Sequence, residues 1–231
     1  MSYLPYTSAQ TTALRNGVMS RVYAWMTAGL LVTAAVASFV AGSTALSSLI
    51  FGNPLIFFGL FIVEIIAVVG LSAGINRLSP ATATAIFIGY AALNGLTLSA
   101  IFLAYTQASI ASTFLVTAGT FGAMSLYGYT TKRDLSTVGN IAIMALIGLL
   151  IASIVNIFLR SAGLYWILTY AGVLIFVALT AWDTQKMKRL AAQVSDETSA
   201  GRIAVLGALI LYLDFINLFI FLLRIFGVRR D

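Results

Sequence analysis

The sequence contains no cysteine and no histidine. Without cysteine, disulfides, thiolate metal sites and thiol nucleophiles are excluded. Without histidine, the chain lacks the commonest general base, the commonest zinc ligand and the only side chain that ordinarily titrates near neutral pH. Chemistry that depends on thiols or imidazoles is therefore excluded from every site in this protein.

Charged residues are also scarce. Only 9% of the 231 residues are charged, whereas 61% are hydrophobic, and the mean hydropathy is +1.02. An ordinary soluble domain has about 25% charged residues, so a surface this poor in charge could not keep the chain dissolved. The net charge of +6 does not indicate nucleic acid, because the basic residues stand singly or in twos and threes between apolar segments. The composition predicts an integral membrane protein that binds no nucleic acid.

Seven apolar runs are long enough to cross a bilayer as helices. A helix needs about 20 apolar residues to cross the roughly 30 Å hydrocarbon core. The runs are approximately Val22–Ala41, Leu55–Ile75, Ala81–Tyr105, Ile110–Tyr129, Val138–Leu159, Leu164–Trp182 and Ile203–Phe226. Most breaks are short and rich in turn residues. Only Asp183–Arg202 is a longer polar connection, and we expect part of it to continue the sixth helix. With no internal repeat, the sequence predicts an all-α fold of seven transmembrane helices in a single domain, residues 1–231.

The positions of lysine and arginine predict the orientation in the membrane. We expect a short cytoplasmic N-terminal segment, residues 1–21, followed by an uncleaved helix, because the first run is longer than the 7–15 residues of a signal-peptide core. This orientation places nine basic residues inside: Arg15, Arg21, Arg77, Lys132, Arg133, Lys186, Lys188, Arg189 and Arg202. The outside then holds Arg160, Arg229 and Arg230. The last two fit the rule only if the final helix bends or re-enters, but we favour seven full crossings.

Three of the seven acidic residues lie within or at the edge of apolar runs: Glu64, Asp183 and Asp214. A charge at the bilayer centre costs about 2.5–3.5 kcal/mol on insertion scales, so such residues usually face the bundle interior and mark a pathway or relay. Asp214 lies near the middle of the last run and shares a helical face with Asn217; it either acts in such a site or only holds helices together. Asp183 is either solvated beside Lys186 or part of a site. Glu64 is either paired with a base on another helix or neutral.

Two carboxyls brought together inside an apolar bundle form a natural proton site. They cannot both ionise easily, so they share a proton, which gives a histidine-free protein a pH switch. When ionised, the same two groups offer hard oxygen ligands suited to Ca²⁺. The linear order places Asp183 nearer the cytoplasm than Asp214, so contact between them requires a helix to tilt or slide.

Two segments carry a family resemblance. The last helix of the Bax inhibitor-1 family resembles residues 211–227, LYLDFINLFIFLLRIFG. The family's aromatic-Asp-Thr-Gln signature is similar to residues 182–185, WDTQ, and the segments around Asn156 and Glu64 fit the family as well. The likeness covers essentially the whole chain, and the compact length is similar to that of a bacterial member.

The resemblance implies a fold in which the C-terminal helix is central and wrapped by the other six, in a bacterial inner membrane. It also implies that Asp183 and Asp214 form a hydrogen-bonded pair that senses pH and gates a calcium leak. Some family members latch this pair with a basic residue at the end of helix two. Arg77 is the candidate here, but Ile75 occupies the helical face of Glu64. The latch is therefore either missing or formed by Arg77 from an unwound helix end.

Our leading functional prediction is a pH-sensitive leak for Ca²⁺, gated by protonation of the aspartate pair. Ca²⁺ would be transported or transiently bound at Asp183 and Asp214, and no cofactor is expected. The side chains that could line a supporting polar path are those of Glu64, Asn94, Asn156 and Asn217.

Two other classes of function are weighed against this prediction. The alternative is a regulatory or cytoprotective interaction protein that contacts other membrane proteins, and the resemblance implies a membrane-bound ATP-dependent protease as one such partner. An intramembrane enzyme is not expected, because the Tyr-Asp and Gly-x-Gly-Asp signatures of aspartyl intramembrane proteases are absent. Asp183 instead follows Trp182, and Asp214 follows Leu213.

Overall fold

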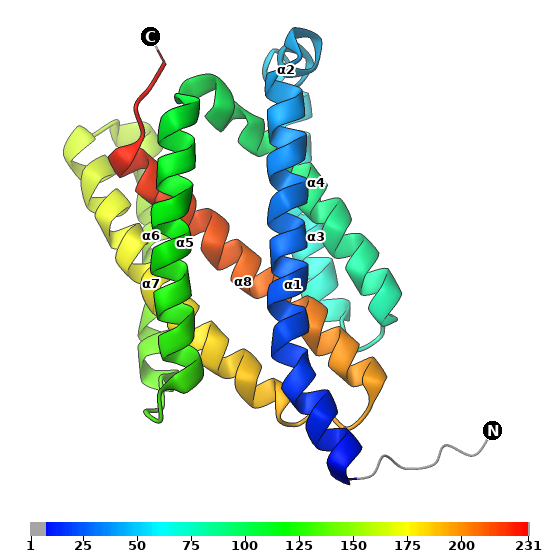
Figure 1. The fold of residues 1–231 in the computed structure, drawn as a ribbon. Helices are drawn as coiled ribbons and strands as arrows, with labels where there is room; N and C mark the ends of the chain where they lie inside the picture. Colours follow the sequence, from blue (N-terminus) through cyan, green and yellow to red (C-terminus); the bar gives the residue numbers. More distant parts are fainter. Residues whose placement is uncertain (1–7, 231) are drawn as a thin grey trace. The chain divides into compact units, whose positions relative to one another are not determined.

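The computed structural model describes residues 8–230, and every regular element in this range is an α-helix (Figure 1). The helices are α1 (Ser8–Ala41), α2 (Thr44–Phe51), α3 (Pro54–Gly74), α4 (Pro80–Ala104), α5 (Gln107–Thr130), α6 (Ser136–Leu159), α7 (Ala162–Ala191) and α8 (Glu197–Phe226). All except α2 are long and apolar enough to cross a membrane. The predicted all-α integral membrane fold with seven spanning helices is confirmed.

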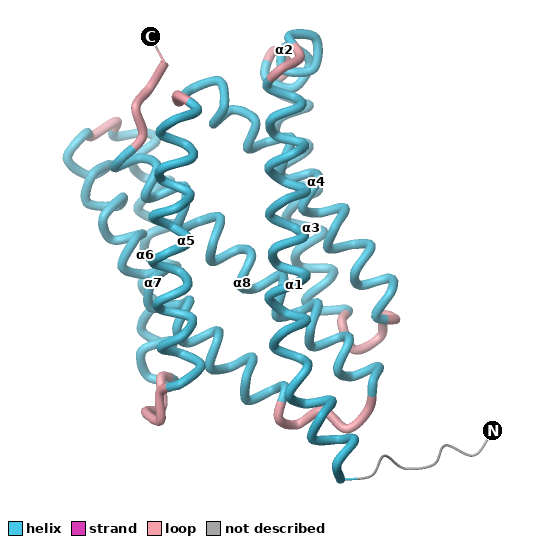
Figure 2. Tube along the Cα trace, in the orientation of Figure 1, coloured by secondary structure: helices cyan, strands magenta, loops and turns pink. Residues whose placement is uncertain are grey.

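Several helices extend beyond the apolar runs, and the connections between the helices are short (Figure 2). The longer polar connection, Asp183–Arg202, is mostly helical: α7 continues to Ala191, as expected for part of it, and α8 already begins at Glu197. Lysine, arginine, glutamine and alanine in this segment are good helix formers, so the helix outlasts the hydrophobic run. Helix α1 likewise begins at Ser8, within the expected segment 1–21, of which residues 1–7 lie outside the described part of the chain.

Polar residues in the breaks start several of the helices. The side chain of Asn53 accepts a hydrogen bond from the backbone N–H of Leu55 at 3.0 Å, and Pro54 occupies the first turn of α3. This combination satisfies a free N–H group and pre-sets the backbone for a helix. Ser43 caps α2 in the same manner. Helix α2 was not predicted, because its eight residues are too few to register as a membrane span.

The helices group into two compact units. Unit 1 comprises Met1–Ala104 and Met187–Tyr212, and unit 2 comprises Tyr105–Lys186 and Leu213–Asp231. Helices α7 and α8 each contribute residues to both units. The prediction of a single domain is not tested by this grouping and stays a prediction.

Burial differs strongly among the seven candidate spans. In the most apolar 18-residue stretch of α8, 72% of the residues are buried, whereas the share is 11% in α3 and in α6. Exposed apolar side chains such as Leu55 on α3 and Phe158 on α6 are what helices facing lipid require. The expected central position of α8 and its wrapping by the other six helices involve both units and stay predictions.

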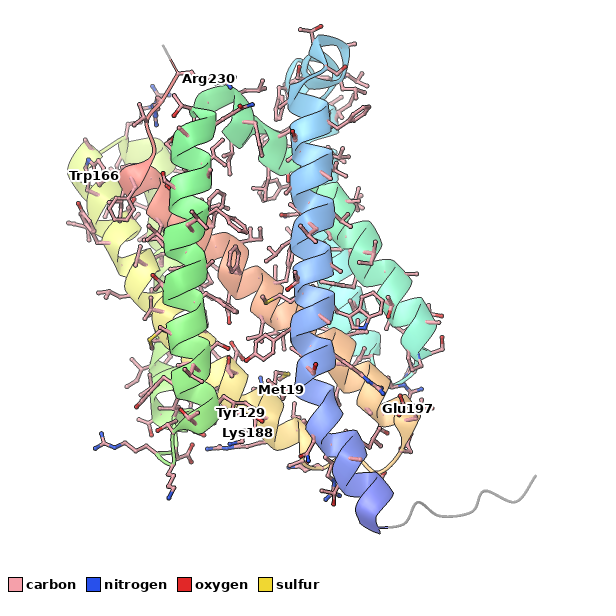
Figure 3. All side chains as sticks on the ribbon, in the orientation of Figure 1. Met19, Tyr129, Trp166, Lys188, Glu197 and Arg230 are labelled. Atoms are coloured by element: carbon pink, nitrogen blue, oxygen red, sulfur yellow. The ribbon has the colours of Figure 1, made fainter. Side chains whose placement is uncertain are left out.

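The tail after α8 returns to the beginning of unit 2. Tyr105 and Arg229 form an isolated antiparallel bridge, and the N–H of Thr106 donates to the carbonyl of Val228 at 2.9 Å. Figure 3 shows Trp166 and Arg230 at this end of unit 2 and Tyr129 at the opposite end. Because α8 is one continuous helix of 30 residues, this arrangement favours a full crossing over a re-entrant last helix.

Candidate functional site

The signature residues Trp182 to Gln185 lie inside α7 and contact the other helices of unit 2. The hydroxyls of Thr184 and Ser125 on α5 are 3.0 Å apart and share a hydrogen bond. The side-chain oxygen of Gln185 accepts from the backbone N–H of Leu135 at 2.9 Å, and its amide donates to the carbonyl of Arg133 at 2.8 Å. Both partners precede α6 (Ser136–Leu159), so Gln185 fixes the segment that leads into this helix.

Two glycines let α5 and α6 approach the signature closely. A Cβ at Gly128 on α5 would overlap the backbone carbonyl of Ala181, and one at Gly139 on α6 would overlap the indole ring of Trp182. The Trp182 indole also contacts Lys186, whose ammonium nitrogen lies 4.8 Å from the ring centroid, a cation–π distance. The backbone of α7 next to Asp183 is therefore fixed from two sides.

Asp183 and Asp214 are both buried within unit 2, with exposed fractions of 6% and 5%. Asp183 is thus buried rather than solvated. An ionised Asp183 acts electrostatically on Asp214, and Lys186 acts on both carboxyls. The Oδ2 atom of Asp214 is buried and has no hydrogen-bond partner among the described residues. The structure brings the two carboxyls within range of each other's charge, while the hydrogen-bonded pair implied by the resemblance stays a prediction.

A calcium ion at this position would need ligands beyond the two aspartates. Ca²⁺ takes six to eight oxygen ligands, whereas two carboxylates supply at most four. Among the described residues, no three acidic, histidine or cysteine side chains gather to hold a metal ion. The two carboxylates alone would therefore leave at least two of the ligands of a calcium ion to water or to other groups.

The two predicted path residues of unit 2, Asn217 and Asn156, form hydrogen bonds with residues four and five positions away in the sequence. The side-chain amide of Asn217 donates to the carbonyl of Leu213 at 2.8 Å. The side-chain oxygen of Asn156 accepts from the N–H of Ser161 at 3.0 Å, which closes the end of α6 next to the left-handed residue Arg160. Each asparagine thus has a local structural partner, and its role in a path stays a prediction.

Glu64 and Asn94 belong to unit 1 and lie together there. Glu64 is buried on α3, with 7% of its surface exposed. Its Oε1 lies 2.9 Å from the Thr97 hydroxyl, within hydrogen-bond distance, and its Oε2 faces the Asn94 amide at 3.5 Å. The Tyr212 hydroxyl on α8 donates to the Asn94 oxygen at 3.1 Å and lies 2.6 Å from the Thr33 hydroxyl on α1. Sequence reasoning missed these hydroxyl partners, because a single Thr or Tyr in an apolar run carries no signal.

Arg77 follows the end of α3 and is exposed. It lies in the turn that begins where α3 ends, at Gly74. This is the position expected if Arg77 forms the latch from an unwound helix end. Arg77 belongs to unit 1 and the two aspartates belong to unit 2. The latch therefore stays a prediction.

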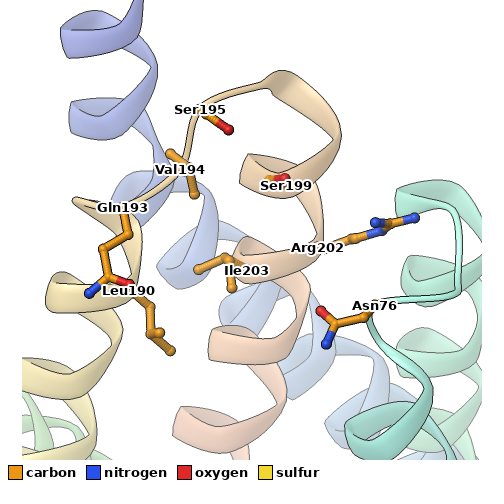
Figure 4. A pocket seen from close by; sticks show the side chains of 8 residues that line it. All are labelled: Asn76, Leu190, Gln193, Val194, Ser195, Ser199, Arg202 and Ile203. Carbon is orange, nitrogen blue, oxygen red and sulfur yellow. The ribbon is translucent and has the colours of Figure 1, made fainter.

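Arginines also organise the end of unit 1 where α7 turns into α8. Arg15 donates to the carbonyl of Val194 at 3.1 Å, Arg21 forms an ion pair with Glu197, and Arg202 donates to the carbonyl of Leu78 at 2.7 Å. A small cavity of about 190 Å³ lies at this turn (Figure 4). Its lining residues are Asn76, Leu190, Gln193, Val194, Ser195, Ser199, Arg202 and Ile203.

Comparison with known proteins agrees with the resemblance in the sequence. The family model described as inhibitor of apoptosis-promoting Bax1 matches residues 15–231. Inner membrane protein YbhL of Escherichia coli K12 is 57% identical over 214 residues, which cover 92% of each chain. An uncharacterized protein of Borreliella burgdorferi is 44% identical over 96% of each chain. Another, of Deinococcus radiodurans, is 42% identical over 100% of this chain and 98% of the relative.

These matches extend over the membrane-spanning helices, the WDTQ signature and the last helix alike. The chain is an integral membrane protein that belongs to the Bax inhibitor-1 family.

Proposed function

We propose that the protein is a pH-sensitive leak for Ca²⁺ in a bacterial inner membrane, gated by protonation of Asp183 and Asp214. The observation that carries the proposal is the burial of these two carboxyls in one unit, within range of each other's charge. In a chain without histidine, carboxyls in such surroundings are the groups best suited to respond to pH.

The gating step follows from electrostatics. With both carboxylates ionised, their repulsion in apolar surroundings is strong, and Lys186 is the nearby charge that offsets it. A shared proton removes the repulsion and lets the two side chains remain together. Losing that proton favours their separation and frees carboxylate oxygens, the type of ligand that Ca²⁺ prefers.

On this proposal Ca²⁺ is cargo rather than a resident cofactor, and the protein carries out no catalysis. Its partners are the lipid bilayer, Ca²⁺ and protons. The N-terminus lies in the cytoplasm, as the excess of lysine and arginine in alternate connections predicts.

The test is Ca²⁺ flux into liposomes that contain the purified full-length protein, measured between about pH 5 and about pH 8. We expect a pH-dependent flux in the wild type and a largely flattened pH response in Asp183→Asn and in Asp214→Asn, because sharing a proton requires both carboxyls. Asp134→Asn is the matched control, since Asp134 belongs to the same unit but is exposed. Glu64→Gln should change the response less than Asp214→Asn.

Two outcomes would contradict the proposal in different ways. Equal pH dependence in the wild type and both aspartate variants would remove the sensor but leave the leak. No flux above empty liposomes, from protein shown to be folded, would favour the alternative, an interaction protein that regulates other membrane proteins such as a membrane-bound protease.

A further inference from the structure

Glu64 occupies the least favourable position in unit 1 for a charge. It is the middle residue of α3, with ten residues of that helix on either side, so it lies about 15 Å from each end. No other acidic and no basic residue stands on α3. Among residues 8–230, no lysine or arginine forms an ion pair with it. An unpaired carboxylate in this position is costly.

The number of hydrogen atoms available for hydrogen bonds around Glu64 also favours the neutral acid over the carboxylate. The Thr97 hydroxyl has one hydrogen to donate, yet its oxygen lies within hydrogen-bond distance of two acceptors, Glu64 Oε1 at 2.9 Å and the Asn94 carbonyl at 3.0 Å. An ionised Glu64 leaves these two acceptors to compete for that hydrogen. A neutral Glu64 donates from Oε1 to Thr97, and Thr97 then donates to Asn94, so both contacts are satisfied.

The lengths of the contacts fit a neutral acid as well. Hydrogen bonds to a carboxylate are typically short, about 2.7–2.9 Å from a nitrogen donor, whereas the Asn94 amide lies 3.5 Å from Glu64 Oε2. Asn94 is also oriented by its other end, since its oxygen accepts from Tyr212. The chain of polar contacts therefore runs from Glu64 through Asn94 and Tyr212 to Thr33, with α3, α4, α8 and α1 each contributing a side chain.

The titratable groups that face Glu64 do not supply a counter-charge. They are Tyr90 on α4 and Tyr212 on α8, whose phenols interact electrostatically with Glu64 and stay neutral near neutral pH. Helix α2 has no titratable residue. The basic residues of unit 1 closest along these helices are Arg21 on α1 and Arg202 on α8, and both are bound elsewhere, to Glu197 and to the Leu78 carbonyl.

We infer that Glu64 is a second proton-binding site, contained in unit 1 and separate from the aspartates of unit 2, and that it holds its proton at neutral pH. The Oε1–H of Glu64 donates to Thr97, and the Thr97 hydroxyl donates to the backbone carbonyl of Asn94. When the proton leaves, Thr97 turns its hydrogen to Glu64 and releases that carbonyl. Proton loss at Glu64 is thereby coupled to the hydrogen bonding of α4.

The chain offers a direct test, because it contains only two glutamates, Glu64 and Glu197. Cell-free synthesis with glutamate ¹³C-labelled at its side-chain carboxyl, in a Glu197→Gln background, places the label at Glu64 alone. Infrared spectra of the full-length protein in lipid vesicles then report whether the labelled group absorbs as a carboxylic acid or as a carboxylate. We expect the acid band at neutral pH, its loss at strongly alkaline pH, and a shift of its frequency in Thr97→Val.

The controls separate this inference from the proposed function. Thr84→Val, on the same helix but thirteen residues away, should leave the band in place. If Glu197→Gln fails to fold, the labelled wild type serves, because exposed Glu197 is paired with Arg21 and contributes a carboxylate band. A labelled signal found only as carboxylate at neutral pH would overturn the inference. The measurement needs no ion flux, so its result is independent of whether the protein conducts Ca²⁺.

Discussion

Gly128 on α5 and Gly139 on α6 matter to the candidate site of unit 2 because they have no side chain. Both lie where α7 passes closest, next to Asp183, and a Cβ at either position would overlap atoms of Ala181 or Trp182. The obstacle at Gly128 is a backbone carbonyl, which cannot rotate away as a flexible side chain can. At the residue scale, the burial of Asp183 thus depends on small residues in neighbouring helices as well as on the acid itself.

Gly128→Ala should therefore destabilise the protein, by about 1–3 kcal/mol, the usual cost of inserting extra atoms into a packed site. The matched control is Gly119→Ala on the same helix, where a Cβ meets nothing within 4 Å. There the higher helix propensity of alanine should stabilise the helix by up to about 1 kcal/mol. Thermal unfolding in a fixed detergent measures both, and equal stability of the two variants would show that α5 and α7 are not in close contact.

At the scale of the element, the turn between α7 and α8 shows how a polar segment becomes helical. The carboxylate of Asp196 accepts from the backbone N–H of Ser199 at 2.9 Å and from its hydroxyl at 2.7 Å. The first of these bonds satisfies a free N–H group at the start of α8. The hydrogen bonds from Ser199, its side chain first and its backbone second, also lower the pKa of Asp196 below its ordinary value of 3.8.

A lowered pKa in the folded protein has a definite sign for stability. The charge of Asp196 stabilises the folded state above the ordinary pKa, and this contribution is lost as the pH falls through the lowered value. Asp196→Asn keeps an acceptor oxygen and removes the charge. Its stability deficit relative to wild type should hold at neutral pH and disappear in strong acid.

Asp196→Ala removes the cap entirely and should cost about 1 kcal/mol at neutral pH. Unfolding midpoints of the wild type and both variants over a pH series measure these differences. A deficit of Asp196→Asn that grows on acidification would contradict the assigned sign.

At the scale of the whole molecule, the orientation in the membrane can be tested on the natural background, because the chain has no cysteine. Ser195, between α7 and α8, and Ser161, between α6 and α7, are both exposed. With the N-terminus in the cytoplasm, Ser195→Cys faces the cytoplasm and Ser161→Cys faces outward.

A maleimide reagent that cannot cross the inner membrane should label Ser161→Cys in cells whose outer membrane has been permeabilised. It should label Ser195→Cys only after the inner membrane has been permeabilised as well. The reverse pattern would invert the topology. Labelling of both sites in intact cells would contradict the assignment of α7 as a spanning helix.

The number of spanning helices and the kind of chemistry were determined by the sequence itself. Membrane crossing depends on the hydrophobicity of about 20 consecutive residues, a local property, so all seven spans could be found. The absence of histidine and the three acids in apolar runs indicate Asp183, Asp214 and Glu64 as candidate site residues without reference to the fold. Helix α2 and the start of α8 at Glu197 were not predicted, because neither depends on apolar length.

The partners of these acids were decided only by the tertiary structure. Gln185 binds the N–H of Leu135 across 50 residues of sequence, and Tyr212 reaches Asn94 across 118. Which side chains meet at such separations depends on the rotation and close approach of whole helices, and a polar residue within an apolar run does not reveal its own partner. For this reason the sequence identified the carboxyl of Glu64, but its hydrogen-bonded neighbours, and with them the inference that it holds a proton, came from the packing of α1, α3, α4 and α8.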